Sequence, residues 1–150
     1  TPATTPSAAQ PPGVGASAGA PRPRVMVLDD EPSIRAFLRK ALMSAGMEVL
    51  PYADGAAAWD GIRSIGGFDV MLIDHRMAEM SGTEFYAAAV KLRPELARRA
   101  VFMRGDVLNP ELRAFAAQRG IRLLAKPFDI ADVVRIVQEV LATDESAADK

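Results

Sequence analysis

The sequence predicts a single α/β domain whose parallel β-sheet is covered by helices on both faces. Short apolar runs alternate with segments in which apolar residues recur at helical spacing, and five such pairs follow one another along the chain. Continuous apolar runs are typical of strands that are buried on both faces of a parallel sheet. The length of 150 residues fits one ordinary domain with a sizeable core.

The five apolar runs define the expected strands, each of which is short. They lie at residues 25–29, 48–51, 68–74, 100–104 and 121–125. Each is followed by a segment with a helical pattern, as expected for strands joined by helical crossovers.

The helix boundaries follow from residues that favour the two ends of a helix. Pro32 suits the opening turn of the first helix and Gly46 its end. Asp54 is expected to cap the second, Pro94 to end the third, and Asn109 with Pro110 to open the fourth. The fifth helix is predicted from Asp129 onward. The residues expected on buried helical faces are Ile34, Phe37, Leu38, Ala41, Leu42 and Ala45; Phe85, Ala88, Ala89 and Leu92; Leu112, Phe115 and Ala116; and Ile130, Val133, Val134, Val137, Val140 and Leu141.

The two ends of the chain differ in composition from this pattern. Residues 1–23 contain six Pro, six Ala, three Gly, five Ser or Thr and a single charge, Arg22. Such a segment has too little large apolar surface to offset the entropy lost on ordering, so we expect a disordered, semi-extended linker to another module. The predicted organisation is a linker over 1–23, a folded domain over 24–142 and a disordered tail over 143–150.

Composition excludes several functions. Cysteine is absent, which removes disulfides, thiolate zinc sites and cysteine nucleophiles, and it fits a reducing, cytoplasmic location. The net charge is −1 without a basic stripe, so direct binding to nucleic acid is not expected. No apolar run approaches the roughly 20 residues that a membrane helix needs, so direct membrane insertion is not expected either.

Charged residues follow the predicted strands at their carboxyl ends. Asp29 and Asp30 end the first strand, Asp74 ends the third, Arg104 the fourth, and Lys126 follows the fifth. Right-handed crossovers make the strands parallel, so these ends share one edge of the sheet, where open α/β sheets bind their ligands. The sequence therefore predicts that three carboxylates and two cations converge there.

Crowded carboxylates raise one another's pKa and destabilise a fold unless a cation lies among them. Ligation by oxygen atoms alone selects a hard cation, and a few carboxylates with open water positions suit Mg²⁺. A carboxylate can also attack phosphorus to form an acyl phosphate, with Mg²⁺ and a lysine stabilising charge on the phosphoryl oxygens. We therefore expect Asp74 to be the nucleophile and Lys126 its electrostatic partner.

Three motifs in this order resemble the receiver domains of two-component response regulators. They are Val-Met-Val-Leu-Asp-Asp-Glu at 25–31, Asp-Val-Met-Leu-Ile-Asp at 69–74 with Gly82 eight residues on, and Lys-Pro-Phe at 126–128. The resemblance covers residues 24–142. It implies a flavodoxin-like doubly wound sheet of five strands in the order 2-1-3-4-5, with five helices.

The same resemblance implies roles for individual residues. Asp74 would accept a phosphoryl group from a phosphohistidine on a histidine kinase or histidine phosphotransfer domain. Asp30 and Asp74 would bind Mg²⁺ directly, Asp29 directly or through water, and the backbone carbonyl of Arg76 would complete the protein's share. A cis peptide bond is expected between Lys126 and Pro127. A domain of this kind promotes only its own phosphorylation and dephosphorylation, so the isolated chain is not expected to be an enzyme.

The sequence departs from the family at positions that matter for switching. Arg104 stands where receivers place Thr or Ser, and Leu123 replaces the usual aromatic residue of the fifth strand. Arg104 is long and fully charged, so we predict that its guanidinium reaches the acidic edge, pairing with Asp74 at rest and with the phosphoryl group afterwards. The alternative is that it points to solvent. Ala78 replaces a frequent proline, and Arg76 could form a salt bridge with Asp106.

Three interpretations of function remain at this point. The first is a phosphorylatable receiver of a phosphorelay, most simply the C-terminal receiver of a hybrid histidine kinase, with atypical switching because of Arg104. The second is a degenerate receiver that acts as a phosphorylation-independent interaction module. The third, a Mg²⁺-dependent phosphohydrolase, lacks the second catalytic acid because Arg76 occupies its place. The only histidine, His75, is expected to be a loop residue, and the oligomeric state does not follow from the sequence.

Overall fold

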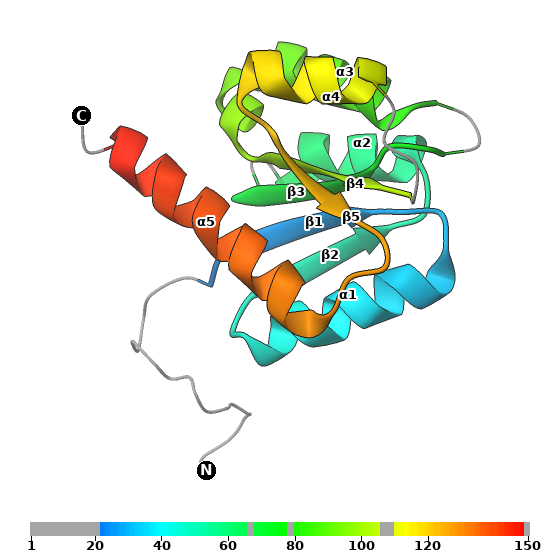
Figure 1. Cartoon of the computed structure of the whole chain (residues 1–150), viewed down its shortest axis with the longest axis vertical. Helices are drawn as coiled ribbons and strands as arrows, with labels where there is room; N and C mark the ends of the chain where they lie inside the picture. Colours follow the sequence, from blue (N-terminus) through cyan, green and yellow to red (C-terminus); the bar gives the residue numbers. More distant parts are fainter. Residues whose placement is uncertain (1–21, 66–67, 78–79, 106–109, 149–150) are drawn as a thin grey trace.

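The computed structural model is a three-layered α/β domain (Figure 1). It describes residues 22–65, 68–77, 80–105 and 110–148, with side chains up to Ala142. Five parallel strands form one sheet in the order β2-β1-β3-β4-β5, which confirms the predicted doubly wound, flavodoxin-like topology. The strands are β1 (Arg24–Leu28), β2 (Glu48–Tyr52), β3 (Val70–Asp74), β4 (Ala100–Arg104) and β5 (Arg122–Ala125).

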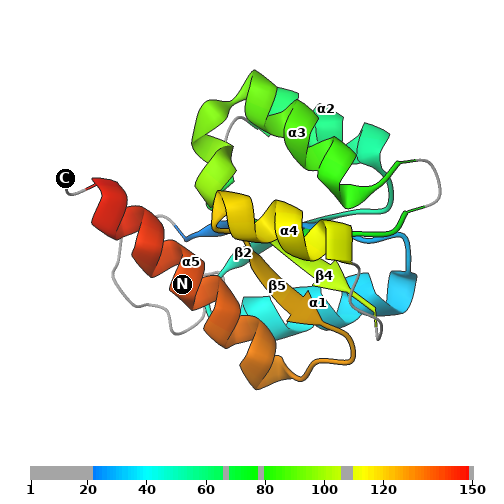
Figure 2. The same cartoon turned by 45° about the horizontal axis from the view of Figure 1, so that its top comes forward.

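The connecting segments are helical, as expected for parallel strands. They are α1 (Pro32–Ser44), α2 (Gly55–Ile65), α3 (Gly82–Leu92), the short 3₁₀ helix η2 (Pro94–Arg98), α4 (Pro110–Arg119) and α5 (Ile130–Ala148). Figures 1 and 2 show α1 and α5 on one face of the sheet and α2, α3 and α4 on the other. No helix within the described part of the chain is both long enough and apolar enough to span a bilayer.

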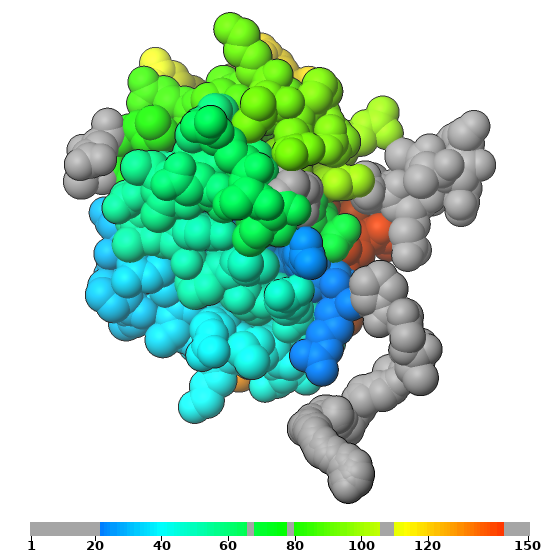
Figure 3. Space-filling view, turned by 180° about the vertical axis from the view of Figure 1, so that it is seen from behind, coloured from blue at the N-terminus to red at the C-terminus, as the bar shows by residue number. Residues whose placement is uncertain are grey.

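Alternation along each strand divides the core into two clusters, one on each face of the sheet. Val27 and Leu72 belong to the cluster under α1 and α5, whereas Leu28 and Phe102 belong to the cluster under α2, α3 and α4. Successive side chains of a strand point to opposite faces, so each strand contributes to both clusters. Viewed from behind, the cyan α1 and the teal and green segments that follow it in sequence lie next to one another on the visible surface (Figure 3).

Local signals at the helix ends act largely as the sequence predicts. Pro32 lies in the first turn of α1, and Gly46 follows that helix with φ at +88°, a conformation that favours glycine. The Asp54 carboxylate accepts a hydrogen bond from the Ala57 N–H at 2.8 Å and so caps α2. At the start of α3, Ser81 and Glu84 form a reciprocal capping box.

Four residues predicted on buried helical faces are exposed. One is Ala45, which directly follows α1 as its C-cap. Ala88 and Leu92 of α3 are exposed, and Tyr86 is buried instead, because its ring packs on Phe102 and Phe115 and its hydroxyl donates to the Ala97 carbonyl. Ile130 is 54% exposed because it begins α5 rather than facing the core. The backbone of α5 stays helical to Ala148, beyond the predicted end of the domain at 142. The linker prediction for 1–23 falls almost entirely outside the described residues.

Candidate acidic site at the carboxyl edge of the sheet

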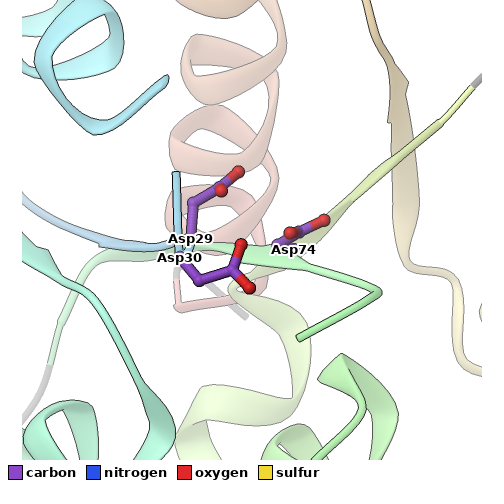
Figure 4. Close-up of side chains that lie close together, drawn as sticks. All are labelled: Asp29, Asp30 and Asp74. Carbon is purple, nitrogen blue, oxygen red and sulfur yellow. The ribbon is translucent and has the colours of Figure 1, made fainter. Parts of the chain in front are cut away.

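Three aspartates meet where β1 and β3 end. One carboxylate oxygen from each of Asp29, Asp30 and Asp74 lies within 4.8 Å of the others (Figure 4). β1 and β3 are adjacent and in register from Val25 opposite Val70, so residues just past the two strands are brought together. Asp29 and Asp74 are buried and Asp30 is exposed. The predicted convergence of the three carboxylates is therefore present in the folded chain.

Asp29 is the most completely enclosed of the three. It is fully buried, and its two carboxylate oxygens already have donors: the Glu31 N–H at 2.9 Å and the Lys126 Nζ at 3.0 Å. Its backbone carbonyl accepts from Arg35 of α1 at 2.8 Å. Asp29 therefore positions Lys126 and has less free capacity for a metal ion than its neighbours have, which fits the expectation of a direct or water-mediated contact.

Asp74 ends β3 and is only 6% exposed. Burial raises the pKa of this carboxyl to about 6, and the nearby negative charge of Asp29 adds to the effect. The charge of Lys126, a hydrogen bond from the backbone of Arg76 and a hydrogen bond from Lys126 lower the pKa but do not restore the ordinary value. The ionised form of Asp74 is thus under-compensated by the protein alone, as expected at a site that receives another cation.

Lys126 places its ammonium among the carboxylates. Its Nζ lies 3.0 Å from Asp29, 3.5 Å from Asp74 and 3.7 Å from Glu31. Burial would lower the pKa of Lys126, but the hydrogen bond to Asp29 and the charges of Asp74, Asp29 and Glu31 outweigh it and raise that pKa. Its N–H donates to the Arg104 carbonyl at 2.8 Å, and the peptide bond to Pro127 is cis, as predicted.

Glycine at position 82 is required by the close return of the chain after β3. The Gly82 N–H donates to the His75 carbonyl at 2.9 Å. A Cβ at position 82 would lie 2.5 Å from the Asp74 carbonyl oxygen and 3.1 Å from the His75 Cα. Backbone cannot yield as a flexible side chain can, so this position supports the site by having no side chain. His75 lies in the loop after β3, as predicted, and burial lowers its pKa.

Arg104 does not make the contact predicted for the resting state. Its Nη1 donates to the carbonyl of the adjacent Gly105 at 3.3 Å, and no ion pair joins it to Asp74 in the part of the chain that the structure describes. The reason is strand alternation. Arg104 follows Phe102 on the face of α2 to α4, whereas Asp74 follows Leu72 on the face of α1 and α5.

The structure also shows two contributors that the sequence analysis did not assign. Glu31 adds a third carboxylate beside Lys126, and Arg35 fixes the backbone of Asp29. Both stand within one turn of the start of α1: Glu31 directly follows the Asp29-Asp30 pair, and Arg35 lies four residues further on. The structure places Arg76 two residues beyond Asp74 on the exposed surface. The expectations for Ala78 and for a bridge to Asp106 lie outside the described residues.

A five-stranded sheet of this order, with carboxylates and a lysine at its carboxyl edge, defines the class of fold that includes receiver domains. Residues 25–138 match the family described as the response regulator receiver domain. The chain therefore belongs to this family, whose members act in two-component signalling.

Individual relatives agree with the family. The response regulator receiver protein CpdR of Brucella abortus (strain 2308) is 32% identical over 121 residues, which cover 79% of this chain and 96% of CpdR. The sensor kinase CckA of the same organism is 28% identical over 118 residues, covering 78% of this chain but 12% of the kinase. The solved structure of the Vibrio cholerae chemotaxis protein CheY4 is 28% identical with a TM-score of 0.72, covering 81% of this chain and 100% of that chain.

Proposed function

We propose that this receiver accepts a phosphoryl group on Asp74 in a Mg²⁺-dependent phosphorelay. The observation that carries the proposal is the position of Asp74, a buried carboxylate with Lys126 Nζ at 3.5 Å and two further carboxylates within 4.8 Å. Groups with strongly perturbed pKa values at such an edge are candidates for chemistry rather than for structure alone. The pKa of about 6 shows how poorly the protein alone compensates this charge.

The donor set fits a hard divalent cation. The oxygens of Asp29, Asp30 and Asp74 lie close enough together to share one ion, and within the described part of the chain no His or Cys joins this group. Asp30 and Asp74 would be direct ligands, Asp29 would bind directly or through water, and the Arg76 carbonyl would add a fourth oxygen. Bound Mg²⁺ would neutralise the carboxylates and stabilise negative charge on the phosphoryl oxygens.

The residues of the chain have distinct parts in the proposed transfer. A carboxylate oxygen of Asp74 forms the new P–O bond as the P–N bond of a phosphohistidine breaks, and the electron pair of that bond stays on the imidazole nitrogen, which takes up a proton. Lys126, held by Asp29, faces the charge that develops on the equatorial oxygens. A charge that is already in place stabilises the transition state more than a solvated charge does, because no groups or water molecules have to be rearranged during the transfer.

The proposed partners follow from this chemistry. The donor is a histidine kinase or a histidine phosphotransfer domain, and we place the chain in the cytoplasm, where such donors act. Similarity to a segment that makes up 12% of the sensor kinase CckA supports an origin in a hybrid histidine kinase. Similarity over nearly the whole of CpdR supports a stand-alone regulator equally well. The isolated chain is not an enzyme in this proposal, since it promotes only its own phosphorylation and dephosphorylation.

Switching is atypical in this proposal because Arg104 replaces a small hydroxyl residue. Among the described residues, one hydrogen bond holds the guanidinium at rest, to the neighbouring Gly105 carbonyl, so little there opposes its movement. A phosphoryl group on Asp74 projects beyond the edge of the sheet and offers a doubly charged partner that the resting carboxylate does not. Arg104 then pairs with the phosphoryl group rather than with Asp74.

Incubation with Mg²⁺ and acetyl phosphate, followed by intact mass measurement, tests the proposal. The wild-type chain should gain the mass of one phosphoryl group, and Asp74→Asn should gain none. Asp69→Asn is a matched control, since Asp69 precedes the same strand but bonds to the Arg24 N–H at 2.8 Å, away from the site. Equal labelling of wild type and Asp74→Asn would contradict the assignment.

A further inference from the structure

The connection between β3 and α3 carries two half-buried methionines beside the acidic site, Met77 and Met80. Both pack against the core cluster under α2, α3 and α4. The thioether of Met80 lies directly on Gly55, the first residue of α2: a Cβ at position 55 would be 3.0 Å from the sulfur. This sulfur therefore rests against backbone, with no room for a further atom between them.

The same connection is held at a second point, next to Asp74. The Gly82 N–H donates to the His75 carbonyl, and Gly82 lies against the carbonyl of Asp74. Met80 and Gly82 are separated only by Ser81, so the Met80 contact with Gly55 and the Gly82 contact with Asp74 hold neighbouring residues. A displacement of Met80 is therefore passed to the backbone that lies against Asp74.

We propose that Met80 is a site of reversible oxidation by peroxides, and that its oxidation weakens metal binding at the acidic edge. The inference rests on the proposed function for its effect on the metal. The sulfur lone pair attacks one peroxide oxygen, an S–O bond forms as the O–O bond breaks, and the second oxygen leaves as water after proton transfer. Sulfur is oxidised by two electrons and the peroxide is reduced; a thiol-dependent sulfoxide reductase reverses the change.

The new oxygen cannot be accommodated in the present packing. Directed at Gly55, it would enter a contact that is already tight. Directed into the apolar cluster, it would be a buried polar atom without a donor, which is unfavourable. Met80 therefore turns toward solvent and loses its contact with Gly55. Gly82 is then held less firmly against the backbone of Asp74, a proposed ligand of the cation.

Five of the other six methionines supply internal references, whereas Met77 is half-buried as Met80 is. Met43, on α1, is 47% exposed and lies outside both core clusters. Met26, Met71 and Met103 are completely buried, and Met47 is 4% exposed. A peroxide should therefore oxidise Met43 readily and without consequence, oxidise Met80 with consequence, and spare the four core residues.

The experiment treats the full chain with hydrogen peroxide and maps oxidised methionines by peptide mass. Mg²⁺ affinity is followed through Trp59, the only tryptophan, and melting temperature is measured in chelator. In wild type, oxidation of Met80 should raise the Kd for Mg²⁺ roughly fivefold to tenfold. This is the lower end of the change in metal affinity that follows when a group supporting a metal ligand is lost. The melting temperature should fall even without metal, and reductase treatment should restore both.

Variants separate the half-buried Met80 from the exposed Met43. Met80→Leu conserves volume, so its Mg²⁺ affinity and its melting temperature should not change under peroxide. In Met43→Leu both quantities should fall, as they do in wild type. Met80→Gln, a polar substitute, should resemble oxidised wild type without peroxide. The inference is overturned if fully oxidised Met80 leaves both quantities unchanged, or if Met80→Leu remains sensitive. A reduced wild type that shows no Mg²⁺ response contradicts the proposed metal site instead, and the melting temperature in chelator still tests Met80.

Discussion

Two neighbouring strands, β5 and β4, each deliver a cation to the same edge of the sheet, and the two cations behave differently. Lys126, just past β5, is 19% exposed and lies within 4 Å of three carboxylates. Arg104, at the end of β4, bonds only to the carbonyl of the next residue in the described part of the chain. The longer side chain is therefore the one that does not reach the aspartates.

The difference is explained by the face of the sheet on which each residue stands. Val27, Leu72 and Leu124 all contribute to the cluster under α1 and α5, and each lies two residues before Asp29, Asp74 or Lys126. Phe102, two residues before Arg104, belongs to the opposite cluster. Because side chains alternate along a strand, the aspartates and the lysine share one face and the arginine takes the other. Proximity along an edge is thus insufficient for an ion pair.

The largest expected effect tests this contrast directly. Lys126→Ala should slow phosphorylation by acetyl phosphate about 100-fold, since it removes a preorganised charge from the reacting oxygens. Arg104→Ala should slow it by less than about threefold, because a half-buried cation without a carboxylate partner among the described residues contributes little. The rates are measured by intact mass over time at saturating Mg²⁺. Comparable losses in the two variants would contradict the division between faces.

Stability as a function of pH tests the charge imbalance at Asp74. The pKa of about 6 in the folded chain exceeds the ordinary value of 3.8, so the folded state binds the proton more tightly than the unfolded chain does. The ionised form therefore reduces stability above about pH 6, and this loss fades as the pH falls toward 4. Asp74→Asn, which resembles the neutral form, should be more stable than wild type by about 1–3 kcal/mol at pH 7.5 without metal.

Denaturant unfolding in chelator at several pH values measures this difference. The advantage of Asp74→Asn should shrink from pH 6 downward and be absent near pH 4. Asp69→Asn is again the control, because Asp69 stands at the opposite end of β3, where its carboxylate has a donor at 2.8 Å. A stability advantage of Asp74→Asn that is independent of pH would mean that the pKa of Asp74 is not raised in the folded chain.

The contrast between the buried Asp29 and the exposed Asp30 predicts an effect on metal binding that is smaller than the two effects above. Asp30 is exposed, whereas both Asp29 oxygens already have donors, so Asp30 should contribute more of the free ligand capacity. Mg²⁺ at about tenfold excess over its Kd should stabilise wild type by about 1–2 kcal/mol. Asp30→Ala should abolish that gain in a thermal melt, and Asp54→Ala, whose carboxylate caps α2, should retain it. A full metal response in Asp30→Ala would remove Asp30 from the site.

Most of the fold and much of the site followed from local patterns. The apolar runs and crossovers predicted five parallel strands, and the residues that follow Leu28, Ile73 and Ala125 predicted the charged edge. These inferences succeed because a parallel topology fixes which strand ends meet. The strand order came instead from the likeness of three motifs to receivers, since periodicity does not determine which strands are neighbours.

The errors arose where contacts between elements decide the outcome. The burial of Tyr86 depends on Phe102 and Phe115, which are distant in sequence and become neighbours only when α4 packs. The error at Arg104 needed the register of β3 and β4, in which Asp74 lies opposite Met103 and Arg104 therefore stands on the other face. The support of Asp29 by Arg35 needed the orientation of α1, which its apolar face gives only approximately.

The smallest expected effect concerns Arg104→Thr, and the structure changes what should be expected of it. A resting pair with Asp74 would compete with Mg²⁺, so its removal would strengthen metal binding. Since the structure shows no such pair among the described residues, the resting Mg²⁺ affinity should change by less than about twofold. The lifetime of the acyl phosphate should change more, because Arg104 meets the phosphoryl group only after transfer.

Trp59 fluorescence measures the Mg²⁺ affinity, and decay of the phosphorylated mass measures the lifetime of the acyl phosphate. Arg63→Thr, an exposed arginine in the last turn of α2, controls for loss of a surface charge. If both quantities match wild type within error, Arg104 remains bonded to its own loop throughout and takes no part in switching; if metal affinity rises strongly, the resting contact with Asp74 forms after all.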